Sequence, residues 1–247
     1  MLVKSKVKYI QSLSQKQLRD QLNVFVAEGP KIFKELASAA NAEPVEIYAT
    51  KEWVQRNAGW NNIIEEVTSD ELSRISSLKS PNQVLAVFKR PHFTDTLTLK
   101  NNISLLLDGI QDPGNMGTII RCADWFGVKN IICSRDCADV YSAKVVQATM
   151  GSICRVRIEY VDLISFLKNY PEIPVYAATL TGKELNKFIS IKEGFLLIGN
   201  ESKGIDSLLL SFANHTIRIP GKGGAESLNA GVATGILLAF MNLGNEA

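Results

Sequence analysis

The stretch of sequence that decides the fold runs from residue 103 to residue 117 and reads ISLLLDGIQDPGNMG. It begins with an apolar run, Ile103 to Leu107, and continues into a polar segment with glycines at positions 109, 114 and 117. A continuous apolar run of this length is typical of a strand that is covered on both faces of a sheet. The residues that follow have helical spacing. The stretch therefore predicts a strand over 103–108, a glycine-containing turn and a helix over 115–126.

The same alternation continues to the C-terminus. Further strands are expected at residues 130–134, 154–160, 175–180, 195–200 and 216–220, and further helices at 143–150, 163–169, 205–211 and 229–243. This alternation predicts an α/β fold with a mostly parallel sheet. Topology alone favours an unknotted, doubly wound sheet, because knots are nearly absent from proteins. Ligands bind such sheets beyond the C-terminal strand ends, which here are the segments after Leu107, Leu180, Ile198 and Ile219.

The N-terminal part has a different organisation. Helical spacing covers residues 17–22 and 30–40 and begins again at Ser69, and strands are expected at 23–27, 45–49, 63–67 and 84–88. The composition changes at Lys89–His92, where charge and proline are followed by threonine-rich polar residues. We therefore predict a small α/β domain over 1–92, a linker over 93–102 and the larger domain over 103–247.

Composition places the chain among globular proteins, with 46% hydrophobic and 21% charged residues among 247. The net charge of +2 is too small to indicate a nucleic-acid partner by itself. The first nineteen residues contain no acidic residue. This basic segment is compatible both with contact to phosphate and with an ordinary solvated surface. Their basic residues are Lys4, Lys6, Lys8, Lys16 and Arg19.

Other classes of protein are disfavoured by the sequence. No apolar run has the length of a membrane span, and we expect no signal peptide. Four cysteines without C-x-x-C spacing and two histidines do not make a convincing zinc site. We therefore expect a cytoplasmic protein without a metal and with reduced thiols.

Polar residues gather in the turns after the predicted strands. The segment Gly114 to Gly117 at a helix start presents free backbone N–H groups to an anion, and Arg121 follows one to two turns later. The alternative is a plain capped helix with a surface arginine. Gly199 and Gly204 flank Glu201 and let a flat ligand approach the backbone, unless this is only a tight turn with a solvent-facing glutamate.

The third turn is a glycine-rich loop over 221–226 that leads into Ser227-Leu228-Asn229. Either Ser227 or Asn229 suits a simple N-cap of the last helix. The sequence contains neither G-x-G-x-x-G nor G-x-x-x-x-G-K-[ST], so a dinucleotide fold and a P-loop are disfavoured. It also lacks the G-x-S-x-G nucleophile elbow.

Together the three turns resemble one family, the SpoU/TrmH (SPOUT) RNA 2′-O-ribose methyltransferases. Its first motif is similar to NMGTIIR at 115–121, its second to LIGNESKGI at 197–205, and its third to the segment from Ile219-Pro220 through Ser227-Leu228-Asn229. The resemblance covers residue 103 to the C-terminus. Residues 7–90, with FVAEG at 25–29, resemble the family's accessory RNA-binding domain, which is itself similar to a ribosomal protein. Gly221 and Ala230-Gly231 depart from the family pattern and affect the expected shape of the pocket.

The resemblance implies a fold, a cofactor and a set of site residues. It implies a deep trefoil knot in the C-terminal domain and the use of S-adenosyl-L-methionine. The implied catalytic residues are Asn115, Arg121, Glu201, Ser227 and Asn229. The implied cofactor-binding residues are Thr179, Leu180, Gly199, Asn200, Ile219 and Leu228. Because an arginine stays protonated, we expect Arg121 to hold the target ribose and phosphate and to stabilise negative charge, with Glu201 positioning Arg121 or the ribose.

The resemblance also implies partners. RNA is the expected substrate, with ribosomal RNA favoured over tRNA. The alternatives are a tRNA 2′-O-methyltransferase and a non-catalytic RNA-binding protein of ribosome assembly. A related enzyme that methylates a base nitrogen of tRNA is disfavoured, because it lacks the Asn115–Arg121 pair. A homodimer is expected through the last helix, where Val232, Ile236 and Phe240 belong to a predicted apolar stripe and Leu238 and Met241 lie outside it.

Overall fold

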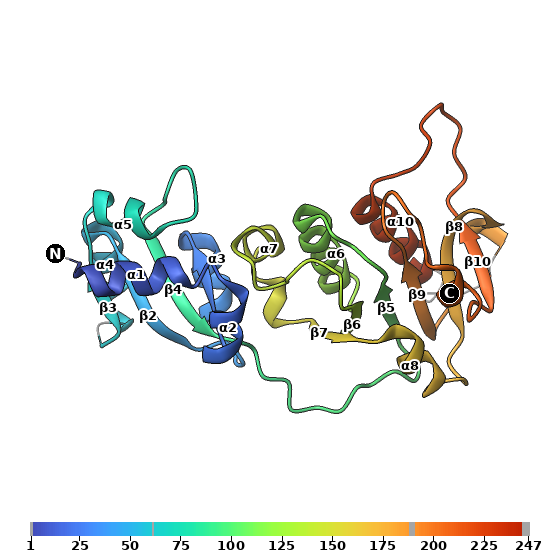
Figure 1. The fold of residues 1–247 in the computed structure, drawn as a ribbon, viewed down its shortest axis with the longest axis horizontal. Coiled ribbons are helices and arrows are strands. Elements are labelled where there is room, and N and C mark those ends of the chain that lie inside the picture. Colours follow the sequence, from blue (N-terminus) through green and yellow to red (C-terminus); the bar gives the residue numbers. More distant parts are fainter. Residues whose placement is uncertain (1, 61, 188–190, 244–247) are drawn as a thin grey trace. The chain divides into compact units, whose positions relative to one another are not determined.

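The computed structural model of the protein describes residues 2–60, 62–187 and 191–243 (Figure 1). Its contacts divide the chain into two compact units. The first unit contains the residues up to 93 together with residues 139–154, and the second contains residues 94–138 and the residues from 155 on. A segment from the middle of the chain therefore belongs to the N-terminal unit.

The first unit is built on a four-stranded sheet with the order β1-β4-β2-β3. Strand β4 is antiparallel to β1 and β2, and β2 is parallel to β3. The strands are β1 (Val24–Glu28), β2 (Pro44–Ala49), β3 (Ile64–Glu66) and β4 (Val84–Lys89). The helices are α1 (Lys4–Ser12), α2 (Lys16–Leu22), α3 (Pro30–Ala37), α4 (Lys51–Arg56), α5 (Ser69–Ile75) and α7 (Ala143–Thr149), with 3-10 turns η1 (Ala58–Trp60) and η2 (Ser152–Cys154).

Local chemistry explains where several of these helices begin. Pro30 occupies the first turn of α3, where its missing N–H costs no hydrogen bond. Thr68 and Glu71 form a capping box at the start of α5, each side chain accepting a hydrogen bond from the other's backbone N–H. Helix α1 was not predicted, because it buries only Val7 and Ile10 among polar residues and its apolar stripe is narrow. The six-residue helix α4 also escaped prediction.

The segment 139–154 packs into the core of the first unit. The Tyr141 ring lies 5.4 Å from the ring of Phe25, centroid to centroid, and the Arg90 guanidinium lies 4.4 Å from the centroid of the Tyr141 ring. Val145 and Val146 of α7 are buried. This segment therefore contributes apolar side chains to the core of the first unit, although it follows a strand of the other unit in the sequence.

A buried arginine fixes the same segment by its charge. The side chain of Arg19 is only 4% exposed, and it forms an ion pair with Asp139. Its Nη1 also donates to the backbone carbonyls of Leu13, at 2.6 Å, and Ser14, at 2.7 Å. The bonds of one guanidinium thus join the α1–α2 turn to the start of segment 139–154.

We expect Arg19→Ala to destabilise the protein by about 3–5 kcal/mol, because removal of one partner leaves a partly buried carboxylate and two carbonyls without their donor. Urea unfolding of the purified protein measures the change. The control is Arg74→Ala on the exposed side of α5, for which a change within about 0.5 kcal/mol is expected. An effect of Arg19→Ala as small as that of the control would show that the ion pair does not hold the segment.

The second unit is a six-stranded sheet with the order β10-β8-β9-β5-β6-β7, and every neighbouring pair in it is parallel. The strands are β5 (Ile103–Leu107), β6 (Asn130–Ser134), β7 (Arg157–Val161), β8 (Val175–Glu184), β9 (Gly194–Ile198) and β10 (His215–Arg218). The helices are α6 (Pro113–Trp125), α8 (Leu163–Lys168), α9 (Ser207–Leu210) and α10 (Ala230–Leu243), with the 3-10 turn η3 (Leu185–Lys187).

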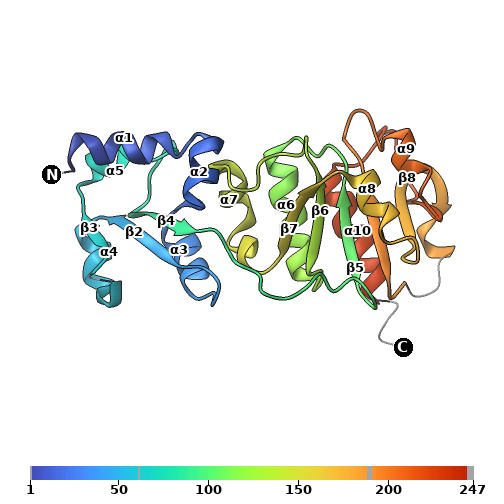
Figure 2. The same cartoon turned by 60° about the horizontal axis from the view of Figure 1, so that its bottom comes forward.

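Helices cover both faces of this sheet (Figure 2). Leu106, Ile132 and Leu197 pack in one core cluster with Phe166 of α8 and Leu209 of α9. Alternate residues of the same strands point to the opposite face, which α6 and α10 cover (Figure 2). Both faces being covered explains why the strands are continuous apolar runs, and it confirms the predicted α/β class with a mostly parallel sheet.

Helices α6 and α10 approach closely through small residues. A Cβ atom built on Gly231 would lie 2.8 Å from Cγ2 of Thr118, and one built on Gly235 would lie 3.3 Å from the sulfur of Cys122. The two glycines are four residues apart and therefore lie on the same face of α10. A larger residue at Gly231 would push the two helices apart.

Every helix and strand expected from the sequence is present, and some boundaries differ. Helix α3 ends at Ala37 instead of residue 40, and β7 begins at Arg157 because 152–154 form a 3-10 turn. Within the described ranges, no helix is long and apolar enough to cross a bilayer. No group of three or more His, Cys, Asp or Glu side chains among those residues is placed to hold a metal ion, and the four cysteines are free thiols.

Candidate active site

The loops after β5 and β9 are joined by hydrogen bonds, because these two strands are neighbours in the sheet. Asn200 Nδ2 donates to the carbonyl of Gly109 at 2.7 Å, and its Oδ1 accepts from the N–H groups of Ser202 and Lys203 at 2.9 and 3.0 Å. The backbone of Asn200 pairs with Gly204 in both directions. Asn200, predicted to bind a cofactor, therefore uses its side chain to shape the two loops.

Two residues at the C-terminal end of β6, which were not predicted from the sequence, hold the same β5 loop. Ser134 Oγ accepts from the N–H of Gly109 at 2.8 Å. The thiol of Cys137 accepts from the N–H of Ile110 at 3.3 Å and donates to the carbonyl of Leu107 at 3.3 Å. Ser134 is the last residue of β6 and Cys137 follows it, so the preference of ligands for the C-terminal strand ends also points to this segment.

The Asp108 carboxylate lies at the same edge. Burial raises the pKa of Asp108, and the negative charges of Asp136 and Asp206 add to the increase, while a 2.7 Å hydrogen bond from the N–H of Asp206 opposes it. A raised pKa means that the folded protein binds this proton more tightly than the unfolded chain. The contribution of Asp108 to stability is therefore present at low pH and is lost as the pH rises through its raised pKa.

Three of the five predicted catalytic residues meet in a chain of hydrogen bonds, which we call the amide relay. Asn115 Nδ2 donates to Glu201 Oε1 at 2.5 Å, and Asn115 Oδ1 accepts from Asn229 Nδ2 at 2.6 Å. Asn229 Oδ1 accepts from the N–H groups of Gly231 and Val232 at the start of α10. The relay thus connects the first turn of α6, the β9 loop and the N-cap of α10.

The other two predicted catalytic residues, Arg121 and Ser227, are exposed and lie outside the relay. Arg121 is six residues beyond Asn115 on α6, which places it about 9 Å further along the helix axis. The partner of Glu201 is therefore Asn115, and the expected contact between Glu201 and Arg121 is not formed among the described residues. The whole loop from Pro220 to Asn229 is exposed (Figure 1).

Two of the predicted cofactor residues, Thr179 and Leu180, lie in a bulge of β8. Strand β10 pairs with Ala177 and then with Lys183, so residues 178–182 leave the ladder. Within this bulge the Thr179 hydroxyl is buried and has no hydrogen-bond partner in the described part of the chain. The next residue, Leu180, is 67% exposed. Leu228 of the glycine-rich loop is 48% exposed. A buried hydroxyl without a partner next to an exposed leucine suits a ligand with polar groups and an apolar ring.

Glycine is required where the backbone of the β9 turn folds on itself. A Cβ atom on Gly199 would lie 2.5 Å from the backbone carbon of Gly204. Gly204 itself has a φ of +73°, which favours glycine. The pair that flanks Glu201 therefore fixes the turn that presents the glutamate to Asn115. Ile219, the remaining predicted cofactor residue, is partly buried immediately after β10.

We expect Asn115→Asp to destabilise the protein by about 1–3 kcal/mol at neutral pH, because a donor facing Glu201 becomes a like charge. The loss should shrink below about pH 4, where carboxyl groups take up protons. Urea unfolding at both pH values measures it.

Adding Glu201→Gln to that variant supplies an amide donor to the new carboxylate and should recover most of the loss. Failure of the second substitution to recover stability would mean that the hydrogen bond between positions 115 and 201 is not what holds the β9 loop to α6.

Comparison with known proteins identifies two sequence families in the chain. The profile of the SpoU rRNA Methylase family matches residues 102–239, which is more than half of the chain and includes the whole relay. The profile of the MRM3-like substrate binding domain matches residues 4–86.

Individual relatives cover three quarters of the chain or more. A 23S rRNA (guanosine(2553)-2′-O)-methyltransferase of Bacillus subtilis is 28% identical over 94% of both chains. A 23S rRNA (guanosine-2′-O-)-methyltransferase of Blochmanniella floridana is 35% identical over 76% of this chain and 79% of its own length. Among solved structures, the AdoMet-bound rRNA methyltransferase from Sinorhizobium meliloti superposes with a TM-score of 0.88 and 29% identity, covering 100% of this chain and 97% of its own.

Proposed function

Because the chain belongs to the SpoU rRNA methylase family, we propose that it transfers a methyl group from S-adenosyl-L-methionine to a ribose 2′-hydroxyl of ribosomal RNA. The observation that carries the proposal is the amide relay, which joins one residue from each of the three motif segments. Two relatives that cover 94% and 76% of the chain are named 23S rRNA 2′-O-methyltransferases, which favours ribosomal RNA over tRNA. The cytoplasm is the compartment that this substrate implies.

The cofactor would be held at the β8 bulge and the β9 turn. The Thr179 hydroxyl is available to donate or accept one hydrogen bond, and Leu180 and Leu228 would cover an apolar ring. Gly199 and Ile219 would contribute backbone groups close to the ligand. When bound, the sulfonium supplies an electrophilic methyl group, and the protein supplies placement. One neighbour of this fold is crystallised with AdoMet, which supports the assignment.

Protein groups would act mainly by position and charge. A ribose hydroxyl is a poor nucleophile until its negative charge is stabilised, and Arg121 is the cation that the first motif supplies. Its exposure leaves its guanidinium free to meet a phosphate and ribose from solvent. The amide relay would hold the loops around the reacting atoms, and Ser227 at the end of the glycine-rich loop would complete the pocket.

We further propose the arrangement that the family implies. The segment from β10 to α10 would close a trefoil knot, as the resemblance to this family implies. The first 92 residues would form a ribosomal-protein-like domain that binds the RNA substrate, with 93–102 as a linker and 103–247 as the methyltransferase domain. The profile match over residues 4–86 supports this role.

The direct test is methyl transfer by the purified protein to ribosomal RNA from cells that lack the gene. We expect incorporation of labelled methyl groups that depends on the cofactor and blocks alkaline hydrolysis at one ribose. Mapping 2′-O-methyl sites in RNA with and without the gene then names the nucleotide. A protein that binds RNA but shows no heat of cofactor binding in calorimetry would instead be the non-catalytic alternative.

A homodimer is also proposed, built on the exposed apolar face of α6 and α10. The side chains of Trp125, Val232 and Ile236 are 84%, 49% and 40% exposed. Leu238 and Met241, which lie outside the predicted stripe of α10, are buried in the core, while Val232 and Ile236 of the stripe are exposed. An exposed apolar face of this kind is typical of a protein interface.

We expect light scattering with gel filtration to give a mass of twice 27.2 kDa and Ile236→Glu to give a monomer, because a charge cannot be buried there without a partner. Leu208→Glu is the matched control, since Leu208 is 62% exposed on the short helix α9. A fully active wild-type protein of monomer mass would contradict the dimer.

A further inference from the structure

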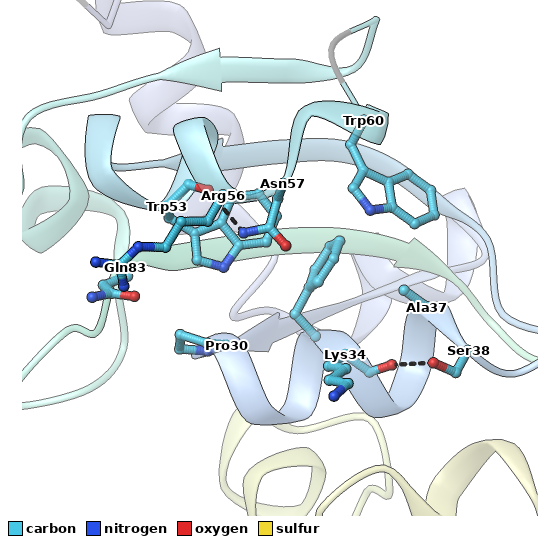
Figure 3. A pocket seen from close by; sticks show the side chains of 10 residues that line it. Pro30, Lys34, Ala37, Ser38, Trp53, Arg56, Asn57, Trp60 and Gln83 are labelled. Carbon is cyan, nitrogen blue, oxygen red and sulfur yellow. Dashed lines mark hydrogen bonds between the residues drawn. The ribbon is translucent and has the colours of Figure 1, made fainter.

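The first unit contains a pocket that the methyl-transfer site does not use. It has a volume of about 370 Å³, within the ~300–1,000 Å³ range of small-ligand sites. It lies between α3 on one side and the segment 51–60, which comprises α4 and η1, on the other (Figure 3). The profile match over 4–86 assigns substrate binding to this part of the chain but to no particular residues.

Three aromatic rings form one wall of this pocket. The Phe33 ring lies 5.0 Å from Trp53 and 5.8 Å from Trp60, both in edge-to-face geometry. Phe33 and Trp53 are buried, whereas Trp60 is only partly buried. Asn57 Nδ2 donates to the carbonyl of Trp53 at 2.8 Å and holds the end of α4. Ring packing and one hydrogen bond therefore hold this wall, and the partly buried Trp60 offers a ring surface to a ligand.

The rim of the pocket is basic. Lys34 and Arg56 are both exposed, and they are the only charged residues among the described residues that line it. They come from opposite sides: Lys34 from α3, and Arg56 from α4, with the Arg56 side chain extending towards Gln83 (Figure 3). The amide groups of Asn57 and Gln83 add donors and acceptors at the edge.

We propose that this pocket binds one unstacked nucleobase of a single-stranded RNA segment, with the base against Trp60 and the flanking phosphates at Lys34 and Arg56. Single-stranded RNA is recognised by aromatic stacking of splayed bases, combined with cations that follow the backbone. An aromatic wall with a rim of only positive charge matches that chemistry. The proposal rests on the proposed function, because the occupant is a nucleotide of the RNA substrate other than the one that is methylated.

The test measures binding of a labelled, unstructured single-stranded RNA to the full-length protein by fluorescence anisotropy. Trp60→Ala is expected to weaken binding by roughly 5–100-fold, the usual effect of losing one stacked base, and Trp60→Phe should retain part of the affinity. Lys34→Gln should lower the affinity for RNA. It should also make the slope of log K against log salt less steep, by about the amount that one phosphate contact contributes. The matched controls are Lys31→Gln and Lys51→Gln, exposed lysines of α3 and α4 that do not line the pocket.

A second RNA of the same length with abasic positions separates base insertion from simple charge attraction. Wild-type protein should bind it more weakly than the intact RNA, and Trp60→Ala should make no further difference. Equal affinity of wild-type protein for the two RNAs would overturn the proposal, and so would wild-type affinity in both Trp60 variants. If Trp60→Ala does not fold, Trp60→Phe and the abasic RNA decide.

Cofactor binding and methyl transfer are measured on the same variants, so that failure of the pocket proposal can be distinguished from failure of the proposed function. Trp60→Ala should raise KM for RNA with kcat and cofactor affinity unchanged. Absence of cofactor binding and of transfer in the wild-type protein would refute the methyltransferase function, and the RNA affinities would still decide the pocket. Transfer by the wild-type protein with unaltered RNA affinity in every pocket variant would refute the pocket alone.

Discussion

Replacing Arg121 with alanine is expected to reduce methyl transfer by about 10²–10³-fold or more, as is typical when a preorganised charge-stabilising group is removed. The rate should fall because the variant lacks a permanent positive charge beside the ribose oxygen on which negative charge develops. Arg121 lies on α6, away from the β8 bulge and β9 turn, so cofactor affinity should remain within a few-fold of the wild-type value. Single-turnover transfer to ribosomal RNA and calorimetric titration with the cofactor measure the two quantities.

Two comparisons make this result specific. Lys129→Ala removes an exposed cation just before β6. This residue lies at the N-terminal end of the strand, whereas the site loops follow the C-terminal strand ends, so the substitution should leave methyl transfer unchanged. Arg121→Lys keeps the charge but loses the planar two-pronged donor, and it should recover only part of the rate. Near-normal turnover by purified Arg121→Ala would remove Arg121 from the catalytic set.

Removal of residues 1–92 is expected to weaken RNA binding by at least about tenfold and to lessen its salt dependence, since phosphate contacts are lost. Cofactor binding should persist, because none of the predicted cofactor residues lies in that part. The fragment should also be less stable than the methyltransferase part of the whole chain. Its segment 139–154 would lose Phe25 and the ion pair with Arg19, and Val145 and Val146 would be exposed.

Anisotropy with ribosomal RNA fragments, calorimetry with the cofactor and thermal unfolding measure these three effects. The control fragment carries Val145→Ser and Val146→Ser, which should improve its solubility without changing cofactor binding. RNA affinity equal to that of the full chain would contradict the assignment of residues 1–92 to RNA binding.

The structure changes the interpretation of the basic N-terminal segment. Arg19 is used in the buried ion pair with Asp139, and Lys6 lies 3.7 and 3.3 Å from the carboxylates of Glu46 and Glu65. Two of the five basic residues in the first nineteen positions therefore have acidic partners within the protein. Sequence spacing gave no sign of this, because each partner is remote along the chain.

The sequence by itself determined the class of the fold and the segments that carry the site. Apolar runs such as Leu105–Leu107 and Leu196–Ile198 are strands because both faces of their sheet are covered, and this periodicity is local information. The glycines at 199 and 204 and the caps at the helix starts follow from the backbone conformations those turns need. The motifs at 115–121, 197–205 and 219–229 could therefore be located in advance.

Only the tertiary structure decided which of these residues meet. In the relay, Asn115 is 86 positions from Glu201 and 114 positions from Asn229. Only the order of the strands in the sheet brings the three residues within hydrogen-bond distance. The same holds for Ser134 and Cys137 beneath the β5 loop, and for segment 139–154 in the first unit. Local propensity carries no record of such pairings, because they depend on which buried surfaces remain to be covered once the strands and helices have formed.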